Sequence, residues 1–264
     1  MKFTKMNGLG NDYLFVYGSV PENIKDLCVK LSDRNFGAGS DGMIYISSSD
    51  KADFSMRIFN ADGSEAEMCG NGIRCVGKYV YEKGYTDKRH LTVETLAGIK
   101  KLDLYISGGK VRRVSVEMGT ASVSEDISLR KNGADIVLTP VSVGNPHAVT
   151  FVSDAESAPV AELGSQIEHD AHFPDGVNVE FAQIISRSVI RMGVWERGSV
   201  ITKACGTGAC ATATAAVSKG YCDSDQPVSV KLDGGVLQIT VLPGSSIIMS
   251  GPAETVYEGE TVSC

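Results

Sequence analysis

The sequence lacks the features that point to a membrane or to nucleic acid. No stretch reaches about 18 consecutive apolar residues, and the first residues, Met1 to Gly8, contain no apolar signal core. We therefore expect a cytoplasmic protein with no membrane partner. The chain has no basic block, and its formal net charge is −7. Because binding to phosphate backbones needs clustered Lys and Arg, we expect no nucleic-acid partner.

The cysteine pattern lacks the signs of a disulfide framework or a zinc ribbon. The chain has 7 cysteines, an odd number, and none of their spacings is Cys-x-x-Cys. A zinc site built from Cys69, Cys75, Cys205 and Cys210 fits the usual ligand spacings badly, so we expect no metal. Reduced thiols are the default. Most of them are interpreted as small hydrophobic residues: Cys28, Cys75, Cys210, Cys222 and Cys264.

What the sequence does contain is an internal repeat. A segment that opens with Cys69-Gly70-Asn71-Gly72 ends at Gly84, and one that opens with Cys205-Gly206-Thr207-Gly208 ends at Gly220, after the same number of residues. The same offset carries Gly98 onto Gly234, both within strand-like runs, and Asn60 onto Glu196. Two halves with one plan are therefore predicted.

The repeat and the apolar periodicity together predict an α+β fold. With 42% hydrophobic residues, the chain can bury a substantial core. Apolar residues at helical spacing mark 24–31 and 160–167, and Gly-containing turns separate short β-rich runs, including 91–95, 101–106, 228–232 and 236–242. Each half is predicted to be a curled mixed sheet packed on a helix. The predicted domains are 1–118 and 119–252, and the tail, about residues 253–264, is a candidate to return to the first.

Each half places a cysteine before a predicted helix. Cys69 precedes a helical stretch that runs through Tyr81, and Cys205 precedes an Ala-rich run. At a helix N-terminus, free N–H groups and the macrodipole favour negative charge, so we expect each thiol to ionise more easily than usual. The glycines allow backbone N–H groups to approach an anion such as a carboxylate.

Two such thiols suit the inversion of a tetrahedral carbon. If the halves face each other about a pseudo-twofold axis, one thiol removes a proton from one face and the other delivers a proton to the opposite face. The plainer interpretation is that both cysteines only pack under the helix starts, because free Cys is often simply buried. The residues alone leave both interpretations open.

The motifs around these cysteines give the chain a family resemblance. Over nearly its whole length, it resembles the diaminopimelate epimerases. The matching segments are Lys5 to Asp12, Arg57 to Ser64, Cys69 to Cys75, Gly144 to His147, Trp195 to Gly198 and Ala204 to Gly208.

This resemblance implies a function and a fold. The function is interconversion of LL- and meso-2,6-diaminopimelate, on the route to lysine and cell-wall precursors, without pyridoxal phosphate or metal. Cys69 and Cys205 occupy the positions of the two acid–base cysteines, one acting as thiolate and the other as thiol. The fold implied is two pseudo-symmetric domains, each a barrel-like mixed sheet around a central helix, in a homodimer.

The resemblance also implies roles for further residues. His147 and Glu196 match residues that tune the ionisation of the thiols. Arg197 can fork onto the distal carboxylate of the substrate. The substrate-binding positions are Asn11, Asn60, Gly70, Asn71, Asn145, Asn178, Glu196, Arg197, Gly206 and Thr207. Taken singly, the Asn residues would be interpreted as turn or strand-end residues, and Glu196 with Arg197 as an ordinary exposed ion pair.

Four positions depart from the family pattern. Asn7 stands where His is usual, Gly42 where many members have Gln, Ile201 where Glu is frequent and Ala148 where Cys is common. None of these departures removes a catalytic group. They bear on which substrate is bound.

Three alternatives remain open at this point. One is a two-cysteine racemase of another amino acid, of the proline or histidine type; Arg197 and Asn178 favour a second carboxylate instead. Another is a hydrolase using Cys69 and His147, but a nucleophilic mechanism needs only one thiol and a base. The last is an inactive amino-acid-binding module, which would be expected to lose a cysteine. Facing cysteines would also be expected to form a reversible, inactivating disulfide when oxidised.

Overall fold

A computed structural model describes residues 1–198 and 200–262 of the chain. Ser199 and residues 263–264 lie outside this description, and with them Cys264 and the end of the predicted tail. The chain divides into two compact units, Met1–Val116 with Gly251–Cys264, and Glu117–Ser250. The predicted domain boundaries at 118 and 252 lie close to these, and the assignment of each half to an epimerase domain stays a prediction.

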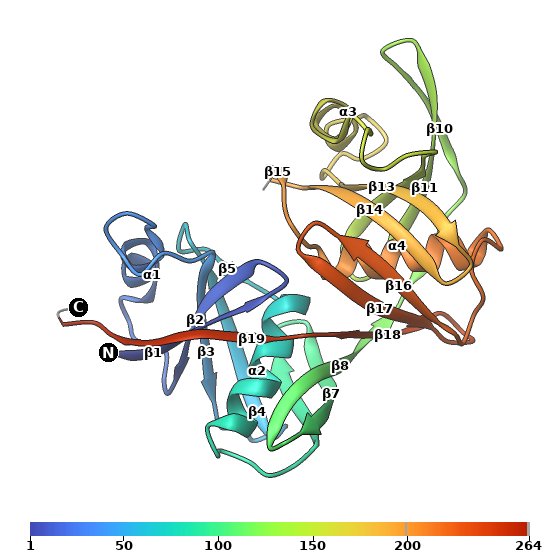
Figure 1. The fold of residues 1–264 in the computed structure, drawn as a ribbon. Helices are drawn as coiled ribbons and strands as arrows, with labels where there is room; N and C mark the ends of the chain where they lie inside the picture. The colour runs from blue at the N-terminus through green and yellow to red at the C-terminus, as the bar shows by residue number, and fades with distance from the viewer. Residues whose placement is uncertain (199, 263–264) are drawn as a thin grey trace. The chain divides into compact units, whose positions relative to one another are not determined.

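The first unit is a mixed sheet in which two neighbouring strands come from opposite ends of the chain. Strand β19 pairs antiparallel with β1, as Figure 1 shows, and β1 pairs with β2. The sheet continues through β3, β4, β6, β7 and β8, with parallel pairs at β2/β3 and β4/β6. The short β5 lies beside β4. The bounds are β1 (Lys2–Gly8), β2 (Asn11–Tyr17), β3 (Gly42–Ser47), β4 (Phe54–Asn60), β5 (Glu65–Ala66), β6 (His90–Thr95), β7 (Gly98–Ser107), β8 (Lys110–Thr120) and β19 (Glu254–Glu260).

A central helix fills the first unit. Helix α2 (Gly70–Glu82) is buried from Gly70 to Val80 and packs against β1, β2 and β7. Even its cations are buried, because Arg74 donates to the carbonyl of Gly70 and Lys78 forms an ion pair with Glu82. Helix α1 (Ile24–Ser32) covers β3 and β4 with its apolar side.

The second unit repeats this order of strands. Strand β11 pairs with β12, β12 runs parallel to β13, β13 antiparallel to β14, β14 parallel to β16, and β17 and β18 complete the series. Strands β9 and β10 pair with β11, and β15 with β14. The bounds are β9 (Ser122–Val123), β10 (Ile127–Lys131), β11 (Ala134–Ser142), β12 (Pro146–Phe151), β13 (Asn178–Ser186), β14 (Val189–Glu196), β15 (Val200–Ile201), β16 (Pro227–Leu232), β17 (Gly235–Val241) and β18 (Ser246–Gly251).

The second unit also has a central helix. Helix α4 (Gly206–Ser218) is rich in Ala, buried from Gly208 to Ala216, and packs against β11, β12, β13, β14 and β17. A helix that is apolar all round belongs in a protein interior, which is where this one lies (Figure 1). Helix α3 (Val160–Glu168) packs on β13 and β14. Each unit is thus a mixed sheet around a central helix, and the predicted α+β fold class is confirmed.

Most of the predicted elements are present, and one repeat position needs correction. The helices expected at 24–31, at 160–167 and after each Cys correspond to α1, α3, α2 and α4. Gly98 begins β7, opposite Thr95, whereas Gly234 lies in a turn and Gly235 takes the equivalent place opposite Leu232. The constant sequence offset therefore fails by one residue at this hairpin. No helix among the described residues is long and apolar enough to cross a membrane.

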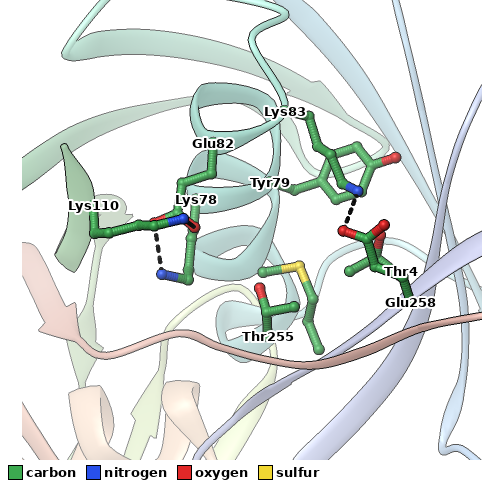
Figure 2. A pocket seen from close by; sticks show the side chains of 9 residues that line it. Thr4, Lys78, Tyr79, Glu82, Lys83, Lys110, Thr255 and Glu258 are labelled. Atoms are coloured by element: carbon green, nitrogen blue, oxygen red, sulfur yellow. Dashed lines mark hydrogen bonds and ion pairs between the residues drawn. The ribbon is translucent and has the colours of Figure 1, made fainter.

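A small cavity of about 170 Å³ lies beside the exposed end of α2. Figure 2 shows how the charged side chains around it pair with one another: Lys78 with Glu82 at 2.8 Å, and Lys83 with Glu258 at 2.6 Å. Lys110 contacts the second oxygen of Glu82 at 3.5 Å. None of the predicted site residues lines this cavity.

Candidate active site

Cys69 is the N-cap of α2. Its extended backbone (φ −131°, ψ 116°) turns its sulfur back over the helix start, where the backbone N–H of Gly72 donates to Sγ at 3.3 Å. The backbone N–H of Asn71 donates to the sulfur as well. A side chain that accepts from the first free N–H groups is what an N-cap provides, so the thiol meets the helix end as the sequence predicts.

The side chains that form hydrogen bonds with Cys69 are neutral. The thiol donates to Asn11 Oδ1 at 3.3 Å, and the Tyr13 hydroxyl forms a hydrogen bond with it. Asn11 is held in turn by Asp41 Oδ2, which accepts from its Nδ2 at 2.8 Å. Burial, and next the charge that Cys69 can carry, raise the pKa of Tyr13 well above its ordinary value. Tyr13 is therefore a neutral partner of the thiol.

The remaining predicted residues of the first unit lie around the same loop. Asn71 is buried, and its Oδ1 accepts from Arg74 Nη2 at 3.0 Å. The carbonyl of Gly70 accepts from Arg74 as well, which fixes the backbone that leads into α2. Asn60, at the end of β4, donates from Nδ2 to Ser64 Oγ at 3.1 Å. Asn11 is thus in direct contact with Cys69, whereas Asn60 and Asn71 have other side-chain partners.

Cys205 is the N-cap of α4 in the same way. Its backbone is extended (φ −114°, ψ 114°), and the N–H of Gly208 donates to Sγ at 3.3 Å. Thr207 Oγ1 lies 3.6 Å from the sulfur. Glu196, from the end of β14, forms a side-chain hydrogen bond with Cys205 and another with Thr202 Oγ1. This thiol, unlike Cys69, has a carboxyl group beside it.

A chain of hydrogen bonds leads away from Cys205 through Thr207. Asn145 Nδ2 donates to Thr207 Oγ1 at 3.4 Å, and Asn145 Oδ1 lies 3.1 Å from His147 Nε2. His147 Nδ1 lies 2.7 Å from Glu180 Oε1, and neither of these two side chains is exposed. The predicted residues Asn145, His147 and Thr207 are therefore connected to the thiol.

Asn178 and Arg197 lie at one edge of this group. Asn178 Nδ2 donates to the carbonyl of Pro146 at 3.0 Å, and its Oδ1 accepts from the backbone N–H of Arg197 at 3.0 Å. The exposed Arg197 side chain donates from Nη1 to the carbonyl of Asp175 at 2.9 Å. The buried Glu168 holds the same loop, because it accepts from the N–H of Gly198 at 3.0 Å.

The position of each thiol at a helix N-terminus predicted a lowered pKa, and the structure differs from this prediction. Burial raises the pKa of Cys69, and the N–H bonds from Gly72 and Asn71 oppose that rise only in part. Burial raises the pKa of Cys205 well above its ordinary value, and the charges of Glu196 and Glu180 add to this rise. The N–H groups do lower both pKa values, as expected, but loss of solvent outweighs them. The predicted easier ionisation is therefore wrong for both thiols.

The sequence interpretation missed Tyr13 and Glu180. A signal for Glu180 was available, because it is the one charged residue of its strand and stands two positions after Asn178, so it faces the same side of the sheet. Tyr13 gives no such signal, because a tyrosine in an apolar run is typical of any strand. Among the described residues, no group of three or more His, Cys, Asp or Glu side chains is arranged to hold a metal ion.

The structure shows the surroundings of all four positions that depart from the family pattern. Asn7 Oδ1 accepts from the N–H of Gly10, and Ala148 is buried in β12. Gly42 has φ +153°, and a Cβ there would lie 2.1 Å from the carbonyl oxygen of Phe59. This backbone therefore excludes a side chain at position 42. Ile201 is half exposed in β15.

The fold is shared with several solved structures. A phenazine biosynthesis protein of the PhzF family from Bacillus anthracis matches with a TM-score of 0.79 at 17% identity, over 100% of this chain and 99% of that one. A probable proline racemase from Agrobacterium radiobacter matches with a TM-score of 0.75 at 17% identity, over 99% and 92%. At such low identity these matches define the fold class alone.

The sequence comparisons are more specific. The family model for diaminopimelate epimerase matches residues 3–124 and 139–256. A diaminopimelate epimerase of Bacteroides thetaiotaomicron is 51% identical over 266 residues, covering 98% of this chain and 97% of its own. One of Acetivibrio thermocellus is 46% identical over 276 residues, covering 98% of each. The chain belongs to the diaminopimelate epimerase family.

Proposed function

We propose that this protein interconverts LL- and meso-2,6-diaminopimelate, with Cys69 and Cys205 as the two acid–base groups. Family membership supports the reaction. The assignment of Cys69 and Cys205 is supported by one observation that occurs in both units. Each unit places a cysteine at the N-cap of its central helix, with a backbone N–H group donating to the sulfur. Such a reaction, in the synthesis of lysine and peptidoglycan precursors, belongs in the cytoplasm.

The proposed reaction moves one proton off and another onto the α-carbon. One cysteine, as thiolate, takes the α-proton, and the electron pair left on carbon is delocalised into the reacting carboxylate. The other cysteine, as thiol, gives its proton to the opposite face and becomes the thiolate. The reverse direction exchanges the two roles. Proton transfer by placed acid and base groups accelerates reactions by about a hundredfold or more, and here two thiols supply both, so no cofactor is required.

The helix starts are suited to hold the reacting carboxylate. The loops Gly70-Asn71 and Gly206-Thr207 present backbone N–H groups at the two helix N-termini. As the α-proton leaves, negative charge grows on the carboxylate oxygens, and N–H groups already aimed at them stabilise it. Burial disfavours the anionic form of each thiol, so proton abstraction depends on these donors.

The distal end of the substrate is assigned to side chains. Arg197 presents a planar guanidinium to solvent and can bind a carboxylate with two parallel N–H bonds. Asn11, Asn60, Asn145 and Asn178 supply amide donors and acceptors for the ammonium and carboxylate groups. Because a substrate with one carboxylate needs no second such site, this set favours a dicarboxylic amino acid.

We also propose that the protein acts as a homodimer. The support is the family resemblance alone. Size-exclusion chromatography with light scattering, at several concentrations, would test it: a mass twice that of the 28.0 kDa chain is expected, and a single chain at all concentrations would overturn it.

The experiment that tests the reaction uses deuterium oxide. Purified, reduced protein is incubated with LL-diaminopimelate, and the products are analysed by chiral separation and mass spectrometry. Formation of the meso isomer with deuterium at the inverted carbon would support both reaction and substrate. If nothing exchanges, while L-proline or L-histidine is racemised, the substrate assignment is wrong and the two-thiol chemistry stands.

A further inference from the structure

Glu180 is a buried carboxylate that has no role in the reaction proposed above. It lies on β13, which runs parallel to β12, and its side chain is fully buried. Oε1 is bonded to His147, whereas Oε2 has no hydrogen-bond partner among the described residues. Taking a carboxylate out of water is costly unless a charge compensates it. The position therefore demands a positive partner, and His147 is the group in contact.

The neighbours of His147 define its hydrogen bonds. Nδ1 faces the carboxylate oxygen of Glu180 at 2.7 Å, and Nε2 faces Asn145 Oδ1 at 3.1 Å. The Asn145 amide is placed so that its Nδ2 donates to Thr207 Oγ1. Because an ionised carboxylate only accepts, Nδ1 donates to Glu180, and in this arrangement Nε2 donates to Asn145 Oδ1.

The contact between His147 and Glu180 determines which group donates in each of the hydrogen bonds that lead to Cys205. Nε2–H donates to Asn145 Oδ1, Asn145 Nδ2–H donates to Thr207 Oγ1, and the Thr207 hydroxyl is left to donate to Cys205 Sγ, 3.6 Å away. A hydroxyl that donates to the sulfur stabilises the thiolate relative to the thiol. The charge of Glu180 by itself raises the pKa of Cys205, so the support that it gives the thiolate is the direction of these hydrogen bonds.

The first unit shows that the repeat does not require this pair. Tyr13 follows Asn11 as His147 follows Asn145, and Ile44 on β3 stands where Glu180 stands on β13. A Cβ added to Gly72 would lie 2.6 Å from Ile44 Cδ1, and one added to Gly208 would lie 2.7 Å from Glu180 Oε1. The pairing of a histidine with a carboxylate is thus specific to the Cys205 half.

We propose that Glu180 is a positioning residue for Cys205: by pairing with His147 it holds Asn145 and Thr207 in the orientation that directs the Thr207 hydroxyl onto the sulfur. The inference rests on the proposed two-thiol function. It deepens that function by assigning the two thiols different supports, hydrogen bonds from neutral side chains at Cys69 and a relay that ends on a carboxylate at Cys205.

Nitrogen NMR of the histidine rings tests this inference. The chain has 4 histidines, and His90, His169 and His172 are exposed, so the signal of His147 can be identified with a His147→Asn variant. The full-length protein should show His147 protonated on both nitrogens. In Glu180→Gln, which keeps the shape and removes the charge, the ring should become a neutral single tautomer.

Kinetics supply the second measurement. Glu180→Gln should lower kcat by about tenfold or more while KM changes little, since the carboxylate does not touch substrate. The loss should be larger in the direction in which Cys205 is the thiolate base. Glu180→Asp, which retains the charge, should keep the doubly protonated ring and recover part of kcat. If Glu180→Gln does not fold, Glu180→Asp and the unmodified protein still test the ring.

A matched control removes a half-buried carboxylate that also pairs with a neighbouring side chain. Glu82→Gln neutralises the partner of Lys78 in the first unit and should leave both the His147 signal and kcat as they are. A neutral His147 in the unmodified protein, or a Glu180→Gln variant with an unchanged ring signal and unchanged kcat, would overturn the inference. The NMR result does not depend on turnover, so a protein inactive on diaminopimelate but with the expected ring states would refute the proposed function and not the ion pair.

Discussion

Adding one methyl group at two equivalent glycines should have unequal effects. Gly72 and Gly208 both lie in the first turn of a central helix, three residues after the N-cap cysteine. In Gly72→Ala the new Cβ meets the end of Ile44, a methyl group that can rotate away. In Gly208→Ala it meets Glu180 Oε1 at 2.7 Å and lies 3.2 Å from Cys205 Sγ. The carboxylate cannot move without lengthening its bond to His147.

The expected difference in the free energy of unfolding comes from the one contact that only Gly208→Ala disturbs. In both variants, replacing Gly by Ala within a helix raises the free energy of unfolding by about 0.5–1 kcal/mol. In both, overpacking lowers it by about 1–3 kcal/mol. Gly208→Ala also disrupts the hydrogen bond between His147 and the charged Glu180 carboxylate, and a bond to a charged group contributes about 1.5–3 kcal/mol. The free energy of unfolding should therefore fall by about 1.5–3 kcal/mol more in Gly208→Ala than in Gly72→Ala.

Urea unfolding provides the assay. Far-UV circular dichroism follows both variants, and the fluorescence of Trp195, the chain's 1 tryptophan, reports on the second unit. Gly208→Ala should also lose most of its turnover, because the sulfur is displaced. Equal losses of stability in the two variants would refute the close contact between the helix start and a fixed Glu180 carboxylate.

Three further outcomes are expected. Burial raises the pKa of Cys75 from 9.0 to about 12, so above pH 9 the folded state holds a proton that the unfolded state releases. The free energy of unfolding should therefore fall as pH rises from about 9 to 12. Urea unfolding of Cys75→Ala should show a shallower fall with pH, and an identical slope would contradict the assignment to Cys75. Arg197→Ala should raise KM for diaminopimelate by about tenfold or more through loss of the distal carboxylate contact, whereas unchanged kcat/KM would mean that Arg197 does not bind it. Dialysis against EDTA should leave turnover unchanged, and a loss restored by added Zn²⁺ or Mg²⁺ would contradict acid–base catalysis by thiols alone.

The repeat made much of the fold predictable. Cys-Gly-x-Gly before a helical run defines an N-cap and a first turn from local chemistry alone, and both cysteines occupy that place. The amphipathic spacing of Ile24, Leu27 and Leu31 is equally local, and α1 buries those residues.

What the sequence could not predict depends on strand register and burial. Glu180 reaches His147 because β12 and β13 pair in parallel with Val149 opposite Glu180, and no local pattern determines that register. The direction of the thiol pKa shifts was also beyond local reasoning. A helix N-terminus lowers the pKa of a thiol, but how completely the surrounding sheet excludes water decides the outcome, and at Cys69 and Cys205 burial dominates.

Single-thiol variants show whether Cys69 and Cys205 are the two acid–base groups. Cys69→Ala and Cys205→Ala are each incubated with LL- and with meso-diaminopimelate in deuterium oxide, and inversion and α-deuterium are measured separately. Each variant should fail to invert either isomer, and any residual exchange should retain configuration, because one thiol can only return a proton to the face from which it was taken. Inversion at a near-normal rate by either variant would contradict the account.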